Sequence, residues 1–61
     1  MVMTNDVVQV YKDVGGGWRW RRVAPNGRVV ATSGEAYKSK WWTKRQAAKN
    51  NPGAKVVIVP R

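Results

Sequence analysis

The sequence predicts an α+β protein with the element order β-β-β-α-β, in which an antiparallel sheet packs against one helix. Three observations carry this prediction. Apolar and polar side chains alternate in the first half of the chain, a basic segment bounded by Ser39 and Pro52 has helical spacing, and a continuous apolar run follows it. A chain of 61 residues has room for one small domain. Its core is expected to be marginal, because a chain of this length buries only about 60% of the surface that its unfolded form exposes.

The first two strands are predicted from side-chain type and period. Residues 1–6 are expected to form a flexible end, and residues 7–61 a single domain. Val7–Lys12 is rich in β-branched and aromatic side chains, which favour a strand. The three glycines of residues 15–17 indicate a turn, because they lose too much conformational entropy inside an element. Trp18–Ala24 then alternates tryptophan and arginine with a period of two, which is typical of a strand.

A hairpin is predicted around Pro25, Asn26 and Gly27. Proline has no N–H for the closing pair of a two-residue hairpin, so a three-residue loop with Gly27 in the left-handed conformation fits better. This loop places Ala24 opposite Arg28, and residues 28–33 form the third strand. One face of the hairpin is then expected to carry Trp18, Trp20, Arg22, Val30 and Thr32, and the other face Arg19, Arg21, Val23, Val29 and Ala31.

Lys40–Asn51 is predicted to be a helix. Ser39 can cap its N-terminus, and Pro52 cannot continue it. A helical wheel divides it into a basic half and an uncharged half, and the uncharged half is expected to face the sheet. The uncharged half consists of Trp42, Thr43, Gln46, Ala47 and Asn50.

The last strand, Val56–Val59, is apolar on both faces, which indicates burial on both faces. An apolar strand at an open sheet edge promotes aggregation, and a monomer of this size has little material to cover it. We therefore expect a homodimer in which two copies exchange this strand. The short connector of residues 51–54 favours exchange over folding back. The exchanged residues are Val56, Val57, Ile58 and Val59.

Several short motifs occur in the order found in the YegP-like family of small uncharacterised proteins. They are Tyr11-Lys12-Asp13, Trp18-Arg19-Trp20-Arg21, Asn26-Gly27, Ala31-Thr32-Ser33-Gly34-Glu35, Tyr37 and Ser39-Lys40. The chain resembles this family over residues 8–59. The resemblance implies two β-β-β-α-β units, here two subunits, that join into one sheet with swapped C-terminal strands. It implies no activity.

The chain departs from the family pattern at Arg22, where an apolar residue is usual, and at Trp41 and Trp42, where small residues are usual. An unpaired guanidinium on the core face is costly. Arg22 must therefore reach the sheet edge, pair with Glu35, or indicate a different register.

The residue types exclude most enzymatic and metal-dependent functions. There is no Cys and no His, and the three carboxylates lie far apart in the sequence. No acid–base pair or nucleophile constellation is apparent, so we expect no enzyme activity, no metal and no cofactor. No apolar run reaches the roughly 18 residues of a membrane span, and the N-terminus lacks the features of a signal peptide. A cytoplasmic location without membrane contact is expected.

The net charge of +9 predicts a polyanionic partner. Two surfaces are candidates. The helix and its start carry Lys38, Lys40, Trp41, Lys44, Arg45 and Lys49, and the sheet face opposite the core carries Tyr11, Arg19 and Arg21. An outward Trp41 can stack on a nucleobase, or it packs on the partner subunit or on the loop of residues 34–38. The arginines of the sheet bind nucleic acid or a phosphorylated ligand, or they are solvated or pair across the dimer.

The expected function is that of a non-enzymatic homodimer that binds nucleic acid through its phosphates. Two alternatives stay open. The chain could be an interaction module that docks on an acidic host protein, and in this way it could serve a virus or mobile element. It could also sequester a small anionic nucleotide at the dimer seam.

Overall fold

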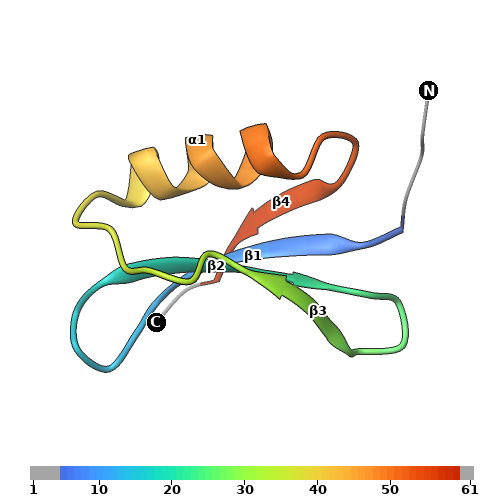
Figure 1. The fold of residues 1–61 in the computed structure, drawn as a ribbon, viewed down its shortest axis with the longest axis horizontal. Coiled ribbons are helices and arrows are strands. Elements are labelled where there is room, and N and C mark those ends of the chain that lie inside the picture. The colour runs from blue at the N-terminus through green and yellow to red at the C-terminus, as the bar shows by residue number, and fades with distance from the viewer. Residues whose placement is uncertain (1–4, 60–61) are drawn as a thin grey trace.

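The computed structural model describes residues 5–59 and has the predicted order of elements. The four strands form one sheet in the order β3-β2-β1-β4, and α1 lies along one face of it (Figure 1). Residues 1–4 of the predicted flexible end lie outside the described residues, and so does Pro60, which was expected to close the last strand. The elements are β1 (Val7–Lys12), β2 (Trp18–Val23), β3 (Val29–Thr32), α1 (Lys40–Asn50) and β4 (Lys55–Ile58).

The sheet is mixed, so the prediction of an antiparallel sheet is wrong for its last strand. β1 pairs with β2 and β2 with β3 in antiparallel fashion, whereas β4 runs parallel to β1. The reason is the number of reversals along the chain. Two hairpins give β3 the direction of β1, and the single helix between β3 and β4 carries the chain back before β4 resumes that direction.

β4 pairs with β1 of its own chain, with Val8 opposite Val56 and Val10 opposite Ile58. The sequence predicted that this strand would complete the sheet of a second copy and be buried on both faces. In the single chain the strand is half-buried instead. Val56 and Ile58 pack against the core under α1, whereas Val57 lies on the face that no described element covers.

The loop between β2 and β3 has the predicted three-residue form. The backbone N–H of Ala24 donates to the carbonyl of Arg28 at 2.8 Å, and the N–H of Gly27 donates to the carbonyl of Ala24 at 2.8 Å. Gly27 has a φ of +86°, the left-handed conformation that the turn requires.

The register beyond this turn differs from the prediction, because β3 contains a bulge. Val23 pairs with Val29 as expected, but Arg22 pairs with Ala31, so that Val30 is an extra residue. Ala31 therefore packs against the core, and Thr32 lies on the opposite face, the reverse of the predicted assignment. The bulge leaves Val30 more than half exposed.

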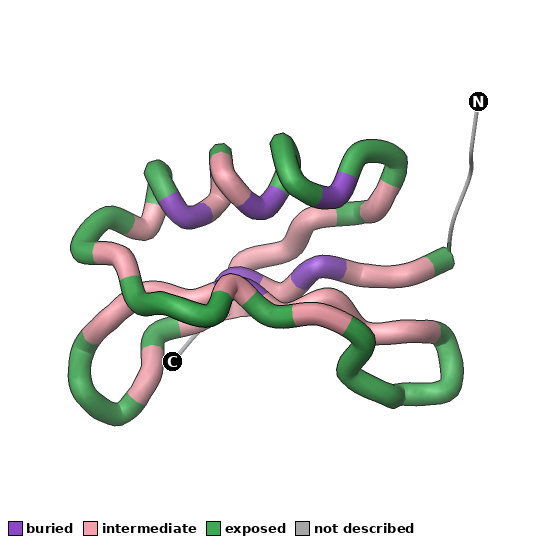
Figure 2. Tube along the Cα trace, in the orientation of Figure 1, coloured by how far each residue is buried: buried purple, intermediate pink, exposed green. Residues whose placement is uncertain are grey.

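The core is small and lies between the helix and the two central strands. Val8, Val10, Trp20 and Ala47 are buried, as Figure 2 shows for the underside of α1 and the middle of the sheet. Thr43 is also fully buried, and its hydroxyl donates to the carbonyl of Ser39 at 2.8 Å. Two small side chains, Thr43 and Ala47, thus let the helix approach the sheet closely.

The predicted sheet-facing half of the helix is only partly correct. Trp42 is 49% exposed and Asn50 is exposed, whereas Lys40 and Lys44 are half-buried. The helix packs on the sheet through the small side chains of Thr43 and Ala47, and the large indole of Trp42 lies outside this helix–sheet contact. A lysine can cover apolar surface with its methylene groups while its ammonium group stays in water, which explains how charged residues come to be half-buried here.

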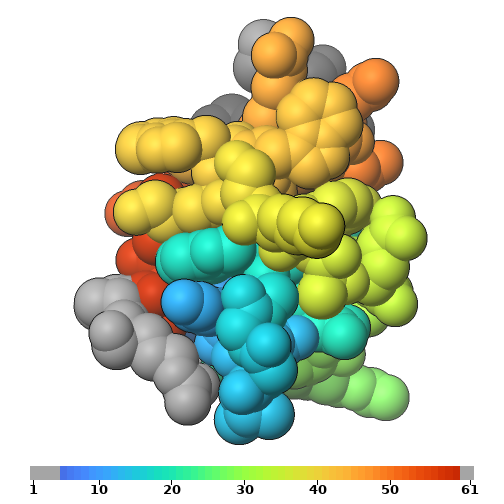
Figure 3. Space-filling view, turned by 90° about the vertical axis from the view of Figure 1, so that its left-hand side faces the viewer, coloured from blue at the N-terminus to red at the C-terminus, as the bar shows by residue number. Residues whose placement is uncertain are grey.

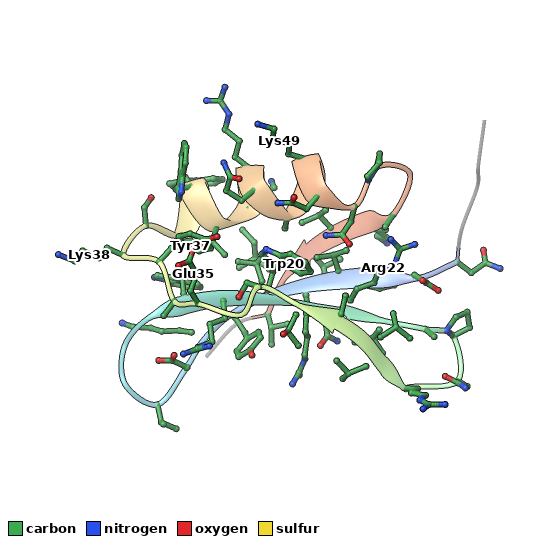
Figure 4. All side chains as sticks on the ribbon, viewed as in Figure 1. Trp20, Arg22, Glu35, Tyr37, Lys38 and Lys49 are labelled. Atoms are coloured by element: carbon green, nitrogen blue, oxygen red, sulfur yellow. The ribbon has the colours of Figure 1, made fainter. Side chains whose placement is uncertain are left out.

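Arg22 lies on the core face as predicted, and its partner is Asp6 rather than Glu35. The guanidinium Nε lies 2.8 Å from the Asp6 carboxylate, and Nη1 donates to the side-chain oxygen of Asn51 at 3.4 Å. The buried Asn51 donates in turn to the carbonyl of Ala47 at 2.8 Å. This network joins the residue before β1, the end of β2 and the C-terminal end of α1. Figure 4 shows the position of Arg22 on the side of the sheet that faces the helix.

Candidate nucleic-acid interface

The first candidate surface, called here the helix surface, consists of Lys38, Lys40, Trp41, Lys44, Arg45 and Lys49. The capped start of α1 positions it. Ser39 is extended, its hydroxyl oxygen accepts from the backbone N–H of Trp42 at 3.2 Å, and Lys40 begins the helix as predicted. Within residues 5–59 none of these cations is paired with a carboxylate, since the ion pairs join Arg19 to Asp13 and Arg22 to Asp6.

An aromatic and basic cluster forms where the helix starts. The ammonium of Lys40 lies 5.4 Å from the centroid of the Trp41 ring and 5.8 Å from that of the Trp18 ring. The ammonium of Lys44 lies 5.5 Å from the Trp41 ring. Trp41 itself is 66% exposed, which rules out packing beneath the loop of residues 34–38. These contacts are cation–π interactions, which orient the two ammonium groups beside one exposed ring.

The loop before the helix fixes this cluster to the sheet. Tyr37 and Trp18 exchange two backbone hydrogen bonds of 2.7 Å, so an isolated antiparallel bridge joins the loop to the start of β2. Figure 3 looks onto this end, where the yellow loop and helix start lie above the teal start of β2. Gly17 permits the close approach, because a Cβ there would lie 2.5 Å from the Cβ of Ala36.

Tyr37 and Glu35 lie together between the helix start and the sheet, whereas Lys38 points outward from the molecule (Figure 4). Burial raises the pKa of the Tyr37 hydroxyl, and its hydrogen bond with the Glu35 side chain raises it further. Tyr37 therefore stays neutral at physiological pH, and its hydroxyl serves as a hydrogen-bond donor.

The second candidate surface, called here the sheet surface, consists of Tyr11, Arg19 and Arg21 with the neighbouring Gln9. As predicted, the structure brings these residues together, since Tyr11 lies opposite Arg19 and Gln9 opposite Arg21 on the face away from α1. The Arg21 guanidinium lies 4.8 Å from the Tyr11 ring centroid, and its Nε donates to the Gln9 side-chain oxygen at 2.6 Å.

Arg19 on the sheet surface is neutralised by Asp13. Its Nε lies 2.7 Å from Oδ2 of Asp13, whose Oδ1 accepts from the N–H groups of Gly15 and Gly17 at 3.0 and 2.8 Å. The hydrogen bond from Arg19 and those from the backbone hold the pKa of the Asp13 carboxyl below its ordinary value of 3.8. The same carboxylate thus orders the glycine turn and compensates a sheet-surface charge.

The predicted helix residues do not all meet. Lys40, Trp41 and Lys44 form one cluster, whereas Lys49 lies on the last turn and points away from the sheet (Figure 4). Trp18 packs against the core, as expected for the face of the hairpin that it shares with Trp20, but its contact with Lys40 was not predicted. No local pattern could have found it, because its contact with Lys40 depends on where the helix starts above β2.

Two further kinds of feature, a cluster of metal-ligating side chains and a helix able to span a membrane, are missing from the described residues. Within residues 5–59, no three carboxylate, imidazole or thiol groups lie close enough to hold a metal ion. Among the same residues, no helix has the length and apolar character of a membrane span.

The fold and its surfaces define a small α+β protein with a basic helix on one face of a four-stranded sheet. Over residues 13–51, more than half of its length, the chain matches the family model described as a domain of unknown function (DUF1508). The chain therefore belongs to this family, the YegP-like family that its motifs resemble.

Among solved structures, the chain is similar to a protein from Haloferax volcanii whose solution structure was determined by NMR. The two share 38% sequence identity with a TM-score of 0.68, over 90% of this chain and 97% of the other. No curated protein matches the chain.

Proposed function

We propose that this protein binds nucleic acid through its phosphates, using the helix surface, and that it is not an enzyme. The observation that carries the proposal is the difference in charge compensation. Two of the three carboxylates pair with arginines on β2, so that the positive charge of α1 has no counterpart within residues 5–59. A surface of this kind attracts a polyanion and releases the counterions that the polyanion carries.

The proposed binding depends on charge and therefore on salt. Each phosphate that a lysine or arginine contacts contributes a slope of about −0.7 for single strands and about −0.9 for duplex DNA to the plot of log affinity against log salt. Because these contacts read the backbone and not the bases, little sequence preference is expected.

The test is a titration of labelled single-stranded and duplex oligonucleotides, followed by fluorescence anisotropy over a range of salt concentrations. A logarithm of the affinity that falls linearly with the logarithm of the salt concentration supports the proposal. No binding at low salt, or binding that salt does not weaken, contradicts it. Retention of an acidic protein after nuclease treatment, without direct oligonucleotide binding, would instead favour protein docking, and a thermal shift with mononucleotides alone would favour nucleotide sequestration.

We also propose that two copies form a homodimer by exchanging β4. The support is the apolar strand at the sheet edge, the short connector of residues 51–54 and the family resemblance. In the exchanged form, the parallel pairing of Val8 with Val56 and of Val10 with Ile58 joins one copy to the other. Native mass spectrometry tests the proposal, since a single-chain mass at micromolar concentration would contradict it.

A further inference from the structure

Resting on the proposed function, we propose that the protein selects single-stranded nucleic acid. In this proposal Trp41 stacks on an unpaired base, while Lys40 and Lys44 hold the phosphates beside that base. The starting observation is the exposure of Trp41, whose side chain is 66% accessible although it lies on a helix beside a small core. An indole left open in this way is a stacking surface for another ring.

The two lysines place positive charge next to that ring. Their ammonium groups lie 5.4 and 5.5 Å from the centroid of Trp41, from positions one residue before it and three residues after it on the helix. Lys40 is also held from the sheet side, because its ammonium lies 5.8 Å from the Trp18 ring. A nucleotide complements this arrangement, because its base offers an aromatic face to the indole and its phosphate, one sugar away, offers an anion to the ammonium groups.

Binding requires the ammonium groups to leave the Trp41 ring. A phosphate is the stronger partner, because an oppositely charged hydrogen-bonded pair exceeds the attraction between a cation and a ring. The lysine side chains are long enough to turn toward the phosphates while their helix positions stay fixed, and the vacated ring face then receives the base.

The requirement for an open base face excludes a duplex from this mode. In a double helix each base is covered above and below by its neighbours, and removing it from the stack costs a few kcal/mol. Duplex DNA can therefore meet the lysines but not the indole. Single strands gain base stacking in addition to phosphate contacts.

Trp42 provides a matched control within the same helix turn. It is the next residue, it is 49% exposed, and within residues 5–59 no cation lies over its ring. Trp41→Ala and Trp42→Ala remove the same side chain at adjacent positions. They differ in whether the lost ring has the two ammonium groups beside it.

The experiment compares three probes of equal phosphate number: a single-stranded oligothymidine, the same backbone without bases, and a duplex. The full chain is expected to bind the oligothymidine about 10- to 100-fold more tightly than the backbone without bases. Trp41→Ala should abolish this preference but keep the salt-dependent binding of the base-free backbone. Trp42→Ala should keep both, with circular dichroism confirming the fold of each variant.

The outcomes separate the two proposals. Equal binding of the oligothymidine and the base-free backbone overturns stacking by Trp41 but leaves phosphate binding intact. Tighter binding of the duplex, or equal loss of preference in both tryptophan variants, also overturns the stacking proposal. No salt-dependent binding of any probe overturns the proposed function itself, and the stacking proposal with it.

Discussion

The helix surface and the sheet surface carry similar residues but differ in what surrounds their charges. On the sheet surface, Arg19 pairs with Asp13, and Arg21 bonds to Gln9 and lies over Tyr11. On the helix surface, the ammonium groups of Lys40 and Lys44 lie near aromatic rings, and neither makes an ion pair with a carboxylate of residues 5–59. Both surfaces combine cations with aromatic side chains, so composition alone does not distinguish them.

The difference indicates that a cation's partners decide whether it is available to a ligand. The charge of a guanidinium paired with a carboxylate is already compensated, which weakens its attraction for a phosphate, whereas a lysine over an indole loses only a weak attraction when it turns to a phosphate. The helix surface is therefore the better candidate for binding, and the sheet surface mainly orders the β1–β2 hairpin.

The strongest test of this comparison removes two charges from each surface in turn. Lys44→Gln with Arg45→Gln is expected to weaken oligonucleotide binding roughly 10- to 100-fold and to reduce the salt slope by about 1 per lost contact. Arg19→Gln with Arg21→Gln lowers the net charge equally and should change affinity less than about threefold. The measurement is anisotropy with a single-stranded oligonucleotide at several salt concentrations. An equal loss in both double variants would show that net charge, and not the helix surface, controls binding.

The position of the helix surface depends on the small residues beneath it. Ala47 has no exposed surface and belongs to the cluster of Val8, Val10 and Trp20, so Ala47→Leu should destabilise the fold by about 1–3 kcal/mol through overpacking. The matched control is Ala48→Leu at the exposed neighbouring position, which should change stability by no more than about 0.5 kcal/mol. Urea unfolding monitored by circular dichroism measures both. Similar effects at the two positions would contradict the observed seating of the helix.

The loop before the helix approaches the glycine turn most closely at Gly17. An alanine Cβ there would lie 2.5 Å from the Cβ of Ala36, so Gly17→Ala should destabilise the fold by about 1–2 kcal/mol. The lower part of the usual range applies because Ala36 is exposed and its loop can shift. Gly15→Ala is the control, since its nearest neighbour is 3.5 Å away and its φ is not positive. Equal stabilities of the two variants in urea would refute the close approach.

The smallest predicted effect is a pH dependence that belongs to the sheet surface. The pKa of Asp13 is lowered in the folded chain, mainly by the hydrogen bond from Arg19. A lowered folded pKa adds stability that is fully present above the unfolded pKa and is lost as pH falls through the folded value. Stability should thus decrease below about pH 3.8, and Asp13→Asn should remove that part of the decrease. Urea midpoints of both proteins over a pH series measure it, and an identical pH dependence would contradict the pairing.

Much of the fold could be predicted because its signals are local. β-Branched and aromatic side chains indicated β1, and alternating side chains indicated β2. Proline and glycine predicted the three-residue loop, and Ser39 precedes the helix where expected. For the candidate sites, the alternation of Trp18–Val23 was enough to place Arg19 and Arg21 on one face of the sheet. Each of these features depends on residues close together in the chain.

The features that were missed depend on contacts between distant residues. The bulge at Val30 turns Ala31 toward the core, and Arg22 reaches Asp6, which is 16 positions away. The helical wheel placed Trp42 inward because it grouped residues by charge, whereas the helix residues buried on the sheet are the small Thr43 and Ala47.

The sequence by itself determined the order of the elements, the turns between them and the excess of positive charge. Only the tertiary structure decided the direction and partner of β4, the burial of the helix residues and the pairing of each cation. The physical reason is the distance along the sequence over which each feature is decided. Backbone conformation and charge follow from neighbouring residues, whereas Asp6, which pairs with Arg22, and Trp18, whose ring lies beside Lys40, come from distant segments that only folding brings together.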